Sequence, residues 1–180
     1  MNMNKIIFAL FPTISNAGLS LEIEACLGCH NPDLKEINPT LHGQHKAYIE
    51  KQLKYFKKDK KENAIMQGLA KTLDDNKIKE LSKLFSEKEW YHSDHVTKPE
   101  NISKGKSFMQ TGNCARCHGH DLKGSWNIPR LAGQSKSYLY STMMRFKKRQ
   151  HIHYPVMSSM LVRYPEKDIE IMADYLAGLK

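Results

Sequence analysis

The chain has 180 residues, 40% of them hydrophobic and 26% charged, which is ordinary for a soluble globular protein of one domain or two small ones. Its formal net charge is +9, which favours a partner with an acidic surface. No apolar run reaches the roughly 20 residues of a transmembrane helix, so we expect no membrane span.

The first 17 residues predict a secretory signal peptide. Lys5 provides a short positive region, residues 6–11 are apolar, and Ser15-Asn16-Ala17 fits the small-x-small cleavage rule. The apolar part is too short for the alternative, a membrane anchor. We therefore expect cleavage after Ala17 and a periplasmic protein, for which nucleic acid is not the expected partner.

Two C-x-x-C-H runs, at residues 26–30 and 114–118, contain all four cysteines. Such a run is typical of c-type haem attachment. Two thiols three positions apart on one helical turn can each bond a vinyl group of the porphyrin, and the next histidine can ligate the iron. The runs predict two covalent haems, held by Cys26, Cys29 and His30 and by Cys114, Cys117 and His118.

Other uses of paired cysteines fit the sequence less well. A structural zinc site often takes two C-x-x-C pairs about 15–20 residues apart, whereas these pairs lie 88 residues apart and each is followed by a histidine. A thioredoxin-like pair would follow a strand in a βαβ pattern, and none is visible. A plain disulfide framework is the remaining alternative.

The sequence contains an internal repeat that includes more than the two cysteine runs. A P-x-L-x-G-Q motif at residues 39–44 returns at residues 129–134, an offset of 90. An apolar stripe with spacings of one, four and three residues follows each motif and predicts a helix that packs on haem and core. The aligned members of the two stripes are Tyr48, Ile49, Leu53 and Phe56, and Tyr138, Leu139, Met143 and Phe146.

A basic stretch follows each of these helices, at residues 57–61 and 145–149. Residues 99–180 contain 13 Lys and Arg against 6 Asp and Glu, whereas residues 18–98 contain 14 against 13. A charge run usually lies in a solvated loop, but the second stretch is less diluted by acids. We expect it to be the centre of a docking patch, formed by Arg145, Lys147, Lys148 and Arg149.

One methionine after each basic stretch is a candidate sixth iron ligand. Met66 and Met157 each lie twelve residues before an isoleucine of the last helix of their half. Methionine opposite histidine is common in electron-transfer haems. Met160 is the second choice in the second half, and Met109, Met143 and Met172 suit the core. Histidine ligation is the other alternative, although its candidates do not align across the repeat: His42, His45, His151 and His153.

Each half ends in a predicted helix. Asp74 is a suitable N-cap for the first, and Pro165 suits the first turn of the second. Residues 86–101 have no sustained periodicity and are interpreted as a linker. We therefore expect an all-α chain of two tandem haem domains, at residues 18–98 (including the linker from about residue 86) and 99–180, after a signal peptide at residues 1–17.

Two tandem units of C-x-x-C-H, P-x-L-x-G-Q, an aromatic helix, a basic loop, Met and a final helix resemble the cytochrome c4 family over nearly all of the mature chain. The resemblance implies two class I cytochrome c domains with pseudo-twofold packing and haem edges near the interface. It implies His30 and His118 as proximal ligands, Met66 and Met157 as distal ligands, and electron delivery toward a terminal oxidase. The Tyr164-Pro165 start of the last helix and the basic second half depart from the family pattern.

We therefore expect a monomeric periplasmic electron carrier, not an enzyme, with no catalytic residue and with acidic redox proteins as its partners. The first alternative is the cytochrome subunit of a flavocytochrome c sulfide dehydrogenase, which would take electrons from a flavin partner. The second is a catalytic dihaem enzyme such as a peroxidase or thiosulfate dehydrogenase. Enzymes of that class usually leave one haem with an open site, and two aligned methionines argue against it.

Overall fold

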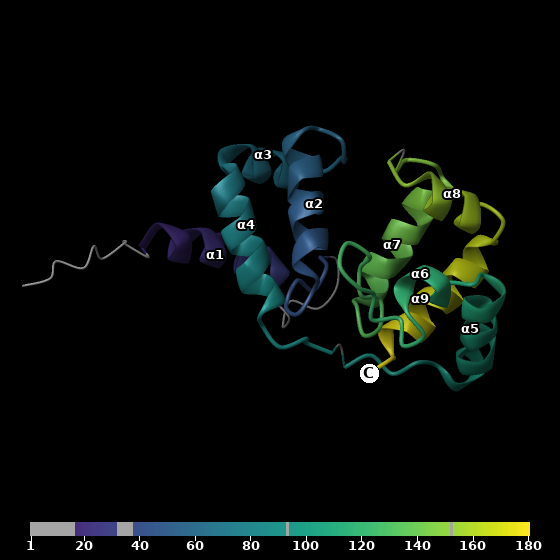
Figure 1. Cartoon of the computed structure of the whole chain (residues 1–180). Helices are drawn as coiled ribbons and strands as arrows, with labels where there is room; N and C mark the ends of the chain where they lie inside the picture. The colour runs from purple at the N-terminus through teal and green to yellow at the C-terminus, as the bar shows by residue number, and fades with distance from the viewer. Residues whose placement is uncertain (1–16, 32–37, 93, 152) are drawn as a thin grey trace, which may run out of the picture.

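The computed structural model describes residues 17–31, 38–92, 94–151 and 153–180. The regular elements of these residues are helices, arranged as two bodies that lie side by side (Figure 1). None of these helices is long and apolar enough to cross a bilayer. The predicted signal peptide lies outside the described residues, except for Ala17.

Within the described residues, the first body contains α1 (Ala17–His30), α2 (Lys46–Lys57), α3 (Ala64–Thr72) and α4 (Asp75–Ser86). Helix α2 packs on both α3 and α4. The predicted cap of the last helix is confirmed, because Asp74 Oδ1 accepts a hydrogen bond of 2.8 Å from the backbone N–H of Lys77. Ile78, Leu81 and Phe85 of α4 are buried, as their helical spacing predicts.

The second body consists of five helices: α5 (Pro99–Thr111), α6 (Ala115–His118), α7 (Lys136–Lys147), α8 (Pro155–Leu161) and α9 (Glu166–Ala177). Helix α9 packs on α5 and α7, and Ile169, Met172, Ala173 and Leu176 are buried in the core. Pro165 precedes α9 as its cap residue, one position before the expected first turn.

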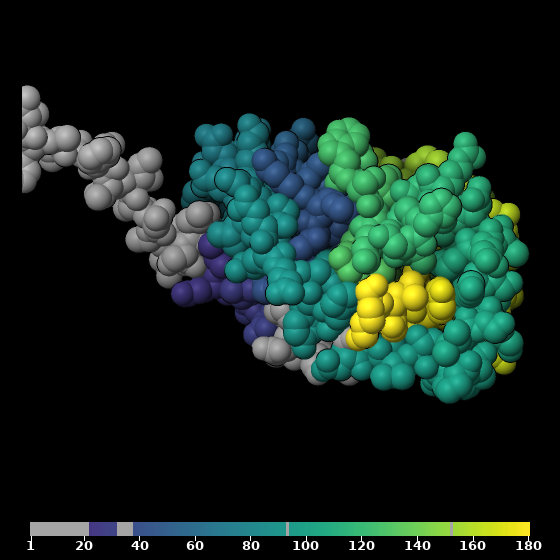
Figure 2. Space-filling model, turned by 60° about the horizontal axis from the view of Figure 1, so that its bottom comes forward, coloured from purple at the N-terminus to yellow at the C-terminus, as the bar shows by residue number. Residues whose placement is uncertain are grey.

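The segment between the two bodies comprises residues 87–98, because α4 ends at Ser86 and α5 begins at Pro99. The expected linker extended to Asn101, so the sequence missed the first turn of α5, where Pro99 occupies a helix-starting position. The segment runs along one side of both bodies and passes beside the C-terminus (Figures 1 and 2).

Two glutamines join the bodies through matched hydrogen bonds. Gln44 accepts from the backbone N–H of Arg130 at 3.0 Å and donates to its carbonyl at 3.2 Å. Gln134 accepts from the N–H of Thr40 at 2.8 Å and donates to its carbonyl at 3.0 Å. Both pairs are related by the offset of 90, so the interface has approximate twofold symmetry, and its motif glutamines are interface residues.

Candidate haem sites

Each C-x-x-C-H run is helical and ends its helix with the histidine. Residues 26–30 form the last turn of α1, and residues 114–118 comprise Cys114 and the short helix α6. None of the four thiols forms a disulfide. Burial raises the pKa of Cys26 and Cys114, whereas Cys29 and Cys117 are exposed. Helical spacing therefore presents two thiols on one turn beside a histidine in both domains.

A backbone carbonyl orients each of these histidines. His30 Nδ1 lies 2.9 Å from the carbonyl oxygen of Pro39, and His118 Nδ1 lies 3.0 Å from that of Pro129. A carbonyl can only accept, so Nδ1 carries the proton and the lone pair of Nε2 is free for a metal. The sequence held a signal for this contact, since the repeated proline follows each histidine by 9 and 11 residues, but the contact itself was not predicted.

The histidine environment favours the uncharged ring. Both rings are buried, and burial lowers the pKa of His30 and of His118, while the bond to the proline carbonyl acts in the opposite direction. A neutral imidazole is the form that ligates iron. The two sites match each other in hydrogen bond, burial and direction of the pKa shift.

The two candidate methionines occupy equivalent helical positions. Met66 is the third residue of α3 and Met157 is the third residue of α8. The side chain of Asn63 caps α3 by accepting from the backbone N–H of Met66 at 3.0 Å. Because α3 and α8 have only 9 and 7 residues, hydrophobic periodicity did not reveal these helices.

Met157 and Met160 have different surroundings. Met157 is partly buried against the core of the second domain. The sulfur of Met160 instead lies 3.2 Å from a guanidinium nitrogen of Arg163. Met160 is partly buried as well, so the choice between the two methionines as iron ligand stays a prediction. Met109, Met143 and Met172 are buried in the core, as expected.

The alternative histidine ligands have other contacts. His42 stacks on Phe85, and His45 Nε2 lies 2.9 Å from the carbonyl oxygen of Lys123. The ring of His151 is tilted against that of Phe146, with 4.7 Å between the ring centres. Burial lowers the pKa of His151 to about 4, with Lys61 and Arg145 adding to the shift. His153 lies against Tyr55. The carbonyl contact of His45 is made through Nε2, whereas His30 and His118 use Nδ1.

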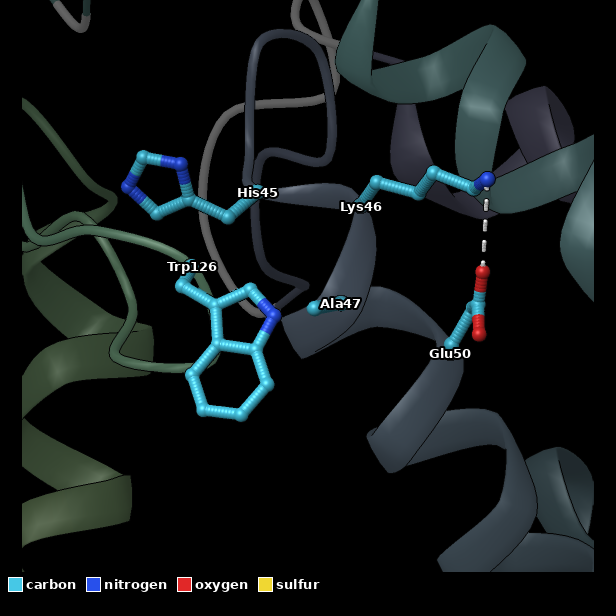
Figure 3. A pocket seen from close by; sticks show the side chains of 5 residues that line it. All are labelled: His45, Lys46, Ala47, Glu50 and Trp126. Atoms are coloured by element: carbon cyan, nitrogen blue, oxygen red, sulfur yellow. Dashed lines mark ion pairs between the residues drawn. The ribbon is translucent and has the colours of Figure 1, made fainter.

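A shallow hollow of about 420 Å³ lies at the domain junction, lined by His45, Lys46, Ala47, Glu50 and Trp126 (Figure 3). Lys46 and Glu50 form an ion pair there, and the Trp126 side chain is 75% exposed. None of the predicted haem-binding residues lines this hollow, so we do not assign a haem to it.

The sequence pattern of the cytochrome c family matches residues 16–86 and residues 102–180, once in each domain. The chain therefore belongs to the cytochrome c family, and with a cysteine pair, a buried histidine and a carbonyl partner in each domain it is a dihaem c-type cytochrome. This membership decides against the zinc, thioredoxin-like and disulfide interpretations.

Similar proteins narrow the class. The chain is 31% identical to cytochrome c4 of Thiocapsa roseopersicina, with 86% of each chain covered. It is 27% identical to the thiosulfate dehydrogenase electron acceptor of Thiomonas intermedia, with 87% of this chain and 79% of that protein covered. The solved structure of cytochrome c4 from Acidithiobacillus ferrooxidans superposes with a TM-score of 0.78 at 28% identity, covering 87% of this chain and 99% of that one. The protein is thus a cytochrome c4-like electron carrier with two c-type haems.

Proposed function

We propose that His30 and Met66 ligate the iron of the first haem and that His118 and Met157 ligate the iron of the second. The matched carbonyl contacts of the two histidines carry the proposal, because they leave Nε2 of both rings available in equivalent places. The equivalent positions of the two methionines support it.

The protein's own part in electron transfer is binding, orientation and exclusion of water. The thiols of Cys26, Cys29, Cys114 and Cys117 anchor the porphyrins, and the carbonyls of Pro39 and Pro129 hold the imidazoles in one tautomer. A haem held in this way supplies a one-electron couple between ferrous and ferric iron. No side chain is required as an acid, base or nucleophile, so the proposed role is carriage rather than catalysis.

We further propose that this carrier works in the periplasm as a monomer and passes electrons between respiratory proteins toward a terminal oxidase. The predicted signal peptide and the likeness to cytochrome c4 over 86% of the chain support this proposal. The net charge of +9 favours acidic surfaces on the partners.

A redox titration of the purified holoprotein, followed by optical spectra, tests the haem assignment. We expect two one-electron steps and, in the ferric state, the charge-transfer band of a thioether–iron bond. A single step, or a ferric spectrum without that band, contradicts the proposed ligand sets. Intact mass of the periplasmic protein should give a chain that begins at Gly18 and carries two haems.

The likeness to a thiosulfate dehydrogenase electron acceptor gives a second candidate for the partner. In that case the chain receives electrons from a sulfur-oxidising enzyme, as a separate carrier or, like a flavocytochrome c subunit, within a complex. Purification from the native periplasm distinguishes the cases: a free carrier elutes alone, whereas a stoichiometric enzyme or flavoprotein partner identifies a subunit.

A further inference from the structure

The segment between the domains contacts the same loop of both repeats. Each P-x-L-x-G-Q motif has its glycine in the left-handed region, with φ of 68° at Gly43 and 74° at Gly133. A Cβ on Gly43 would lie 2.9 Å from the backbone N and Cα of Trp90. A Cβ on Gly133 would lie 3.0 Å from both Trp90 Nε1 and His92 Nδ1. The repeated glycines therefore make room for one shared neighbour, which is the segment.

Trp90 also binds the second domain through its ring. The guanidinium of Arg130 lies 4.4 Å from the centre of the indole, a geometry in which the cation is attracted to the ring face. The backbone of Arg130 is the group that Gln44 of the first domain holds. Trp90 therefore packs against the point where the two domains are hydrogen-bonded to each other.

The far end of the segment is fastened to the second domain. The carboxylate of Asp174 in α9 is fully buried and bonds His95 Nε2 at 2.8 Å and the backbone N–H of Lys98 at 3.0 Å. The hydroxyl of Thr97 donates to the carbonyl of Asp174 at 3.2 Å. The segment is thus attached to α9 at its end and is packed between the two motif loops at Trp90. We call this packed segment, residues 87–98, the brace.

We propose that Trp90 is a positioning residue, which holds the two haem domains in the orientation for electron exchange between them. This inference rests on the proposed function. In the exchange, one electron leaves the ferrous haem of one domain and reduces the ferric haem of the other, with no proton transferred. Trp90 itself is not oxidised or reduced and acts only through the relative position of the domains.

The test uses the dihaem holoprotein with Trp90→Ala, Trp90→Phe and the matched control Trp126→Ala. Trp126 is the other tryptophan of the chain; it also lies at the domain junction, on the hollow of Figure 3, but it is 75% exposed, so it controls for the loss of a junction indole that is not packed between the motif loops. Nitroxide labels at Lys79→Cys in α4 and Lys167→Cys in α9 report the distance between the domains by pulsed electron resonance. Rapid reduction of the protein by one electron, started by a light pulse, reports the rate at which that electron equilibrates between the two haems.

For Trp90→Ala we expect a broad distance distribution and a rate at least about tenfold lower, because the rate of electron exchange depends on how the domains position the two haems relative to each other. Trp90→Phe, which keeps a ring between the loops, and Trp126→Ala should keep the narrow distribution and the rate. If Trp90→Ala keeps both, the positioning role is wrong. If Trp126→Ala changes them as much as Trp90→Ala does, the role is wrong as well.

Two further measurements separate this inference from the proposed function. Haem content and the thioether band test only the proposed ligands. If Trp90→Ala has a normal spectrum and an unchanged distance distribution, the positioning role of Trp90 is refuted and the proposed function is not. Should Trp90→Ala fail to give a dihaem protein, Arg130→Ala removes the stacked guanidinium but keeps the backbone bonds to Gln44. It should broaden the distribution to a smaller extent, and an unchanged distribution overturns the proposal.

Discussion

At His30 and His118, the proposed haem ligands, a backbone carbonyl occupies the place that a carboxylate often takes at other metal sites. A carbonyl adds no charge to a buried place and cannot be protonated, so the tautomer stays fixed over a wide pH range. This explains why a proline recurs after both histidines. Proline keeps its carbonyl and restricts φ, and it has no N–H that would need a partner in the loop.

Substitution of the methionines should separate the two haems. Met66→Ala and Met157→Ala should each remove about half of the ferric thioether band and lower one of the two potentials, because methionine raises the potential of a histidine-ligated haem. Optical redox titration measures both effects. Met160→Ala is the control, because its sulfur contacts Arg163. If Met160→Ala halves the band and Met157→Ala leaves it whole, the repeat alignment is wrong there.

Asp174 is a buried carboxylate that depends on its donors. Burial alone would raise its pKa, but hydrogen bonds from Asn101, the Lys98 N–H, Lys136 and His95 outweigh this effect and lower the pKa to about 2. The ammonium of Lys136 lies 3.1 Å from the carboxylate. The hydrogen bonds to the Asp174 carboxylate join α5, α7, α9 and the interdomain segment, so removal of this carboxylate should affect the stability of the whole second domain.

Asp174→Asn should lower the free energy of unfolding by about 3 kcal/mol at neutral pH, since it leaves Lys136 without its buried partner. The folded pKa is lower than the unfolded value of 3.8, so this contribution is complete above about pH 4 and is lost as the pH falls toward 2. Urea unfolding of the holoprotein at several pH values should show the two proteins converging on acidification. A constant difference between pH 6 and pH 2.5 would contradict the assignment.

At the scale of elements, the sequence predicted what is periodic and missed what is short or depends on contacts. The stripes of α2, α4, α7 and α9 were visible because one buried face recurs every three or four residues. Helices α3 and α8 are too short for that signal. The contacts of Trp90 with Gly43 and Gly133 join residues 43–47 positions apart and follow no local pattern.

Two cations of the basic stretch at the end of α7 form hydrogen bonds to backbone carbonyls, which the sequence did not predict. Arg145 donates to the carbonyl of Glu62 in the first domain at 2.9 Å, and Lys147 donates to the carbonyls of Val162 and Tyr164. These two cations stabilise the interface and the end of α8. Lys148 and Arg149 are exposed, and a bond to a neutral carbonyl leaves the charges of Arg145 and Lys147 in place, so the docking patch of all four residues stays a prediction.

The crossing of α5 and α9 depends on a glycine. A Cβ on Gly105 would lie 2.3 Å from Tyr175 Cβ, whereas a Cβ on Gly68 in α3 would meet no atom within 4 Å. Gly105→Ala should destabilise the protein by about 1–3 kcal/mol through overpacking. Gly68→Ala should be neutral or stabilise by up to about 1 kcal/mol through helix propensity. Thermal unfolding measures both, and equal effects would show that α5 and α9 do not cross this closely.

For the molecule as a whole, one pair of equivalent positions accounts for two of the six charges by which the domains differ (+7 against +1). Asp59 and Arg149 are related by the offset of 90, and both adopt left-handed backbone just after their helix, with φ of 53° and 56°. Asp59 forms an ion pair of 2.8 Å with Lys71. The exposed position thus holds a paired carboxylate in the first domain and an added cation in the second.

Exchanging these two residues should move positive charge between the domains while the formal net charge stays at +9. With the anionic oxidant ferricyanide in stopped flow, we expect Arg149→Asp to slow oxidation of the second haem, by about threefold to tenfold at low salt, because electrostatic steering raises association rates. Asp59→Arg should speed oxidation of the first haem, and the double variant should do both. The differences should shrink as salt rises above about 0.1 M, where the screening length is about 10 Å. Rates that follow only net charge, and that are therefore unchanged in the double variant, would show that this position does not steer oxidants to the second haem.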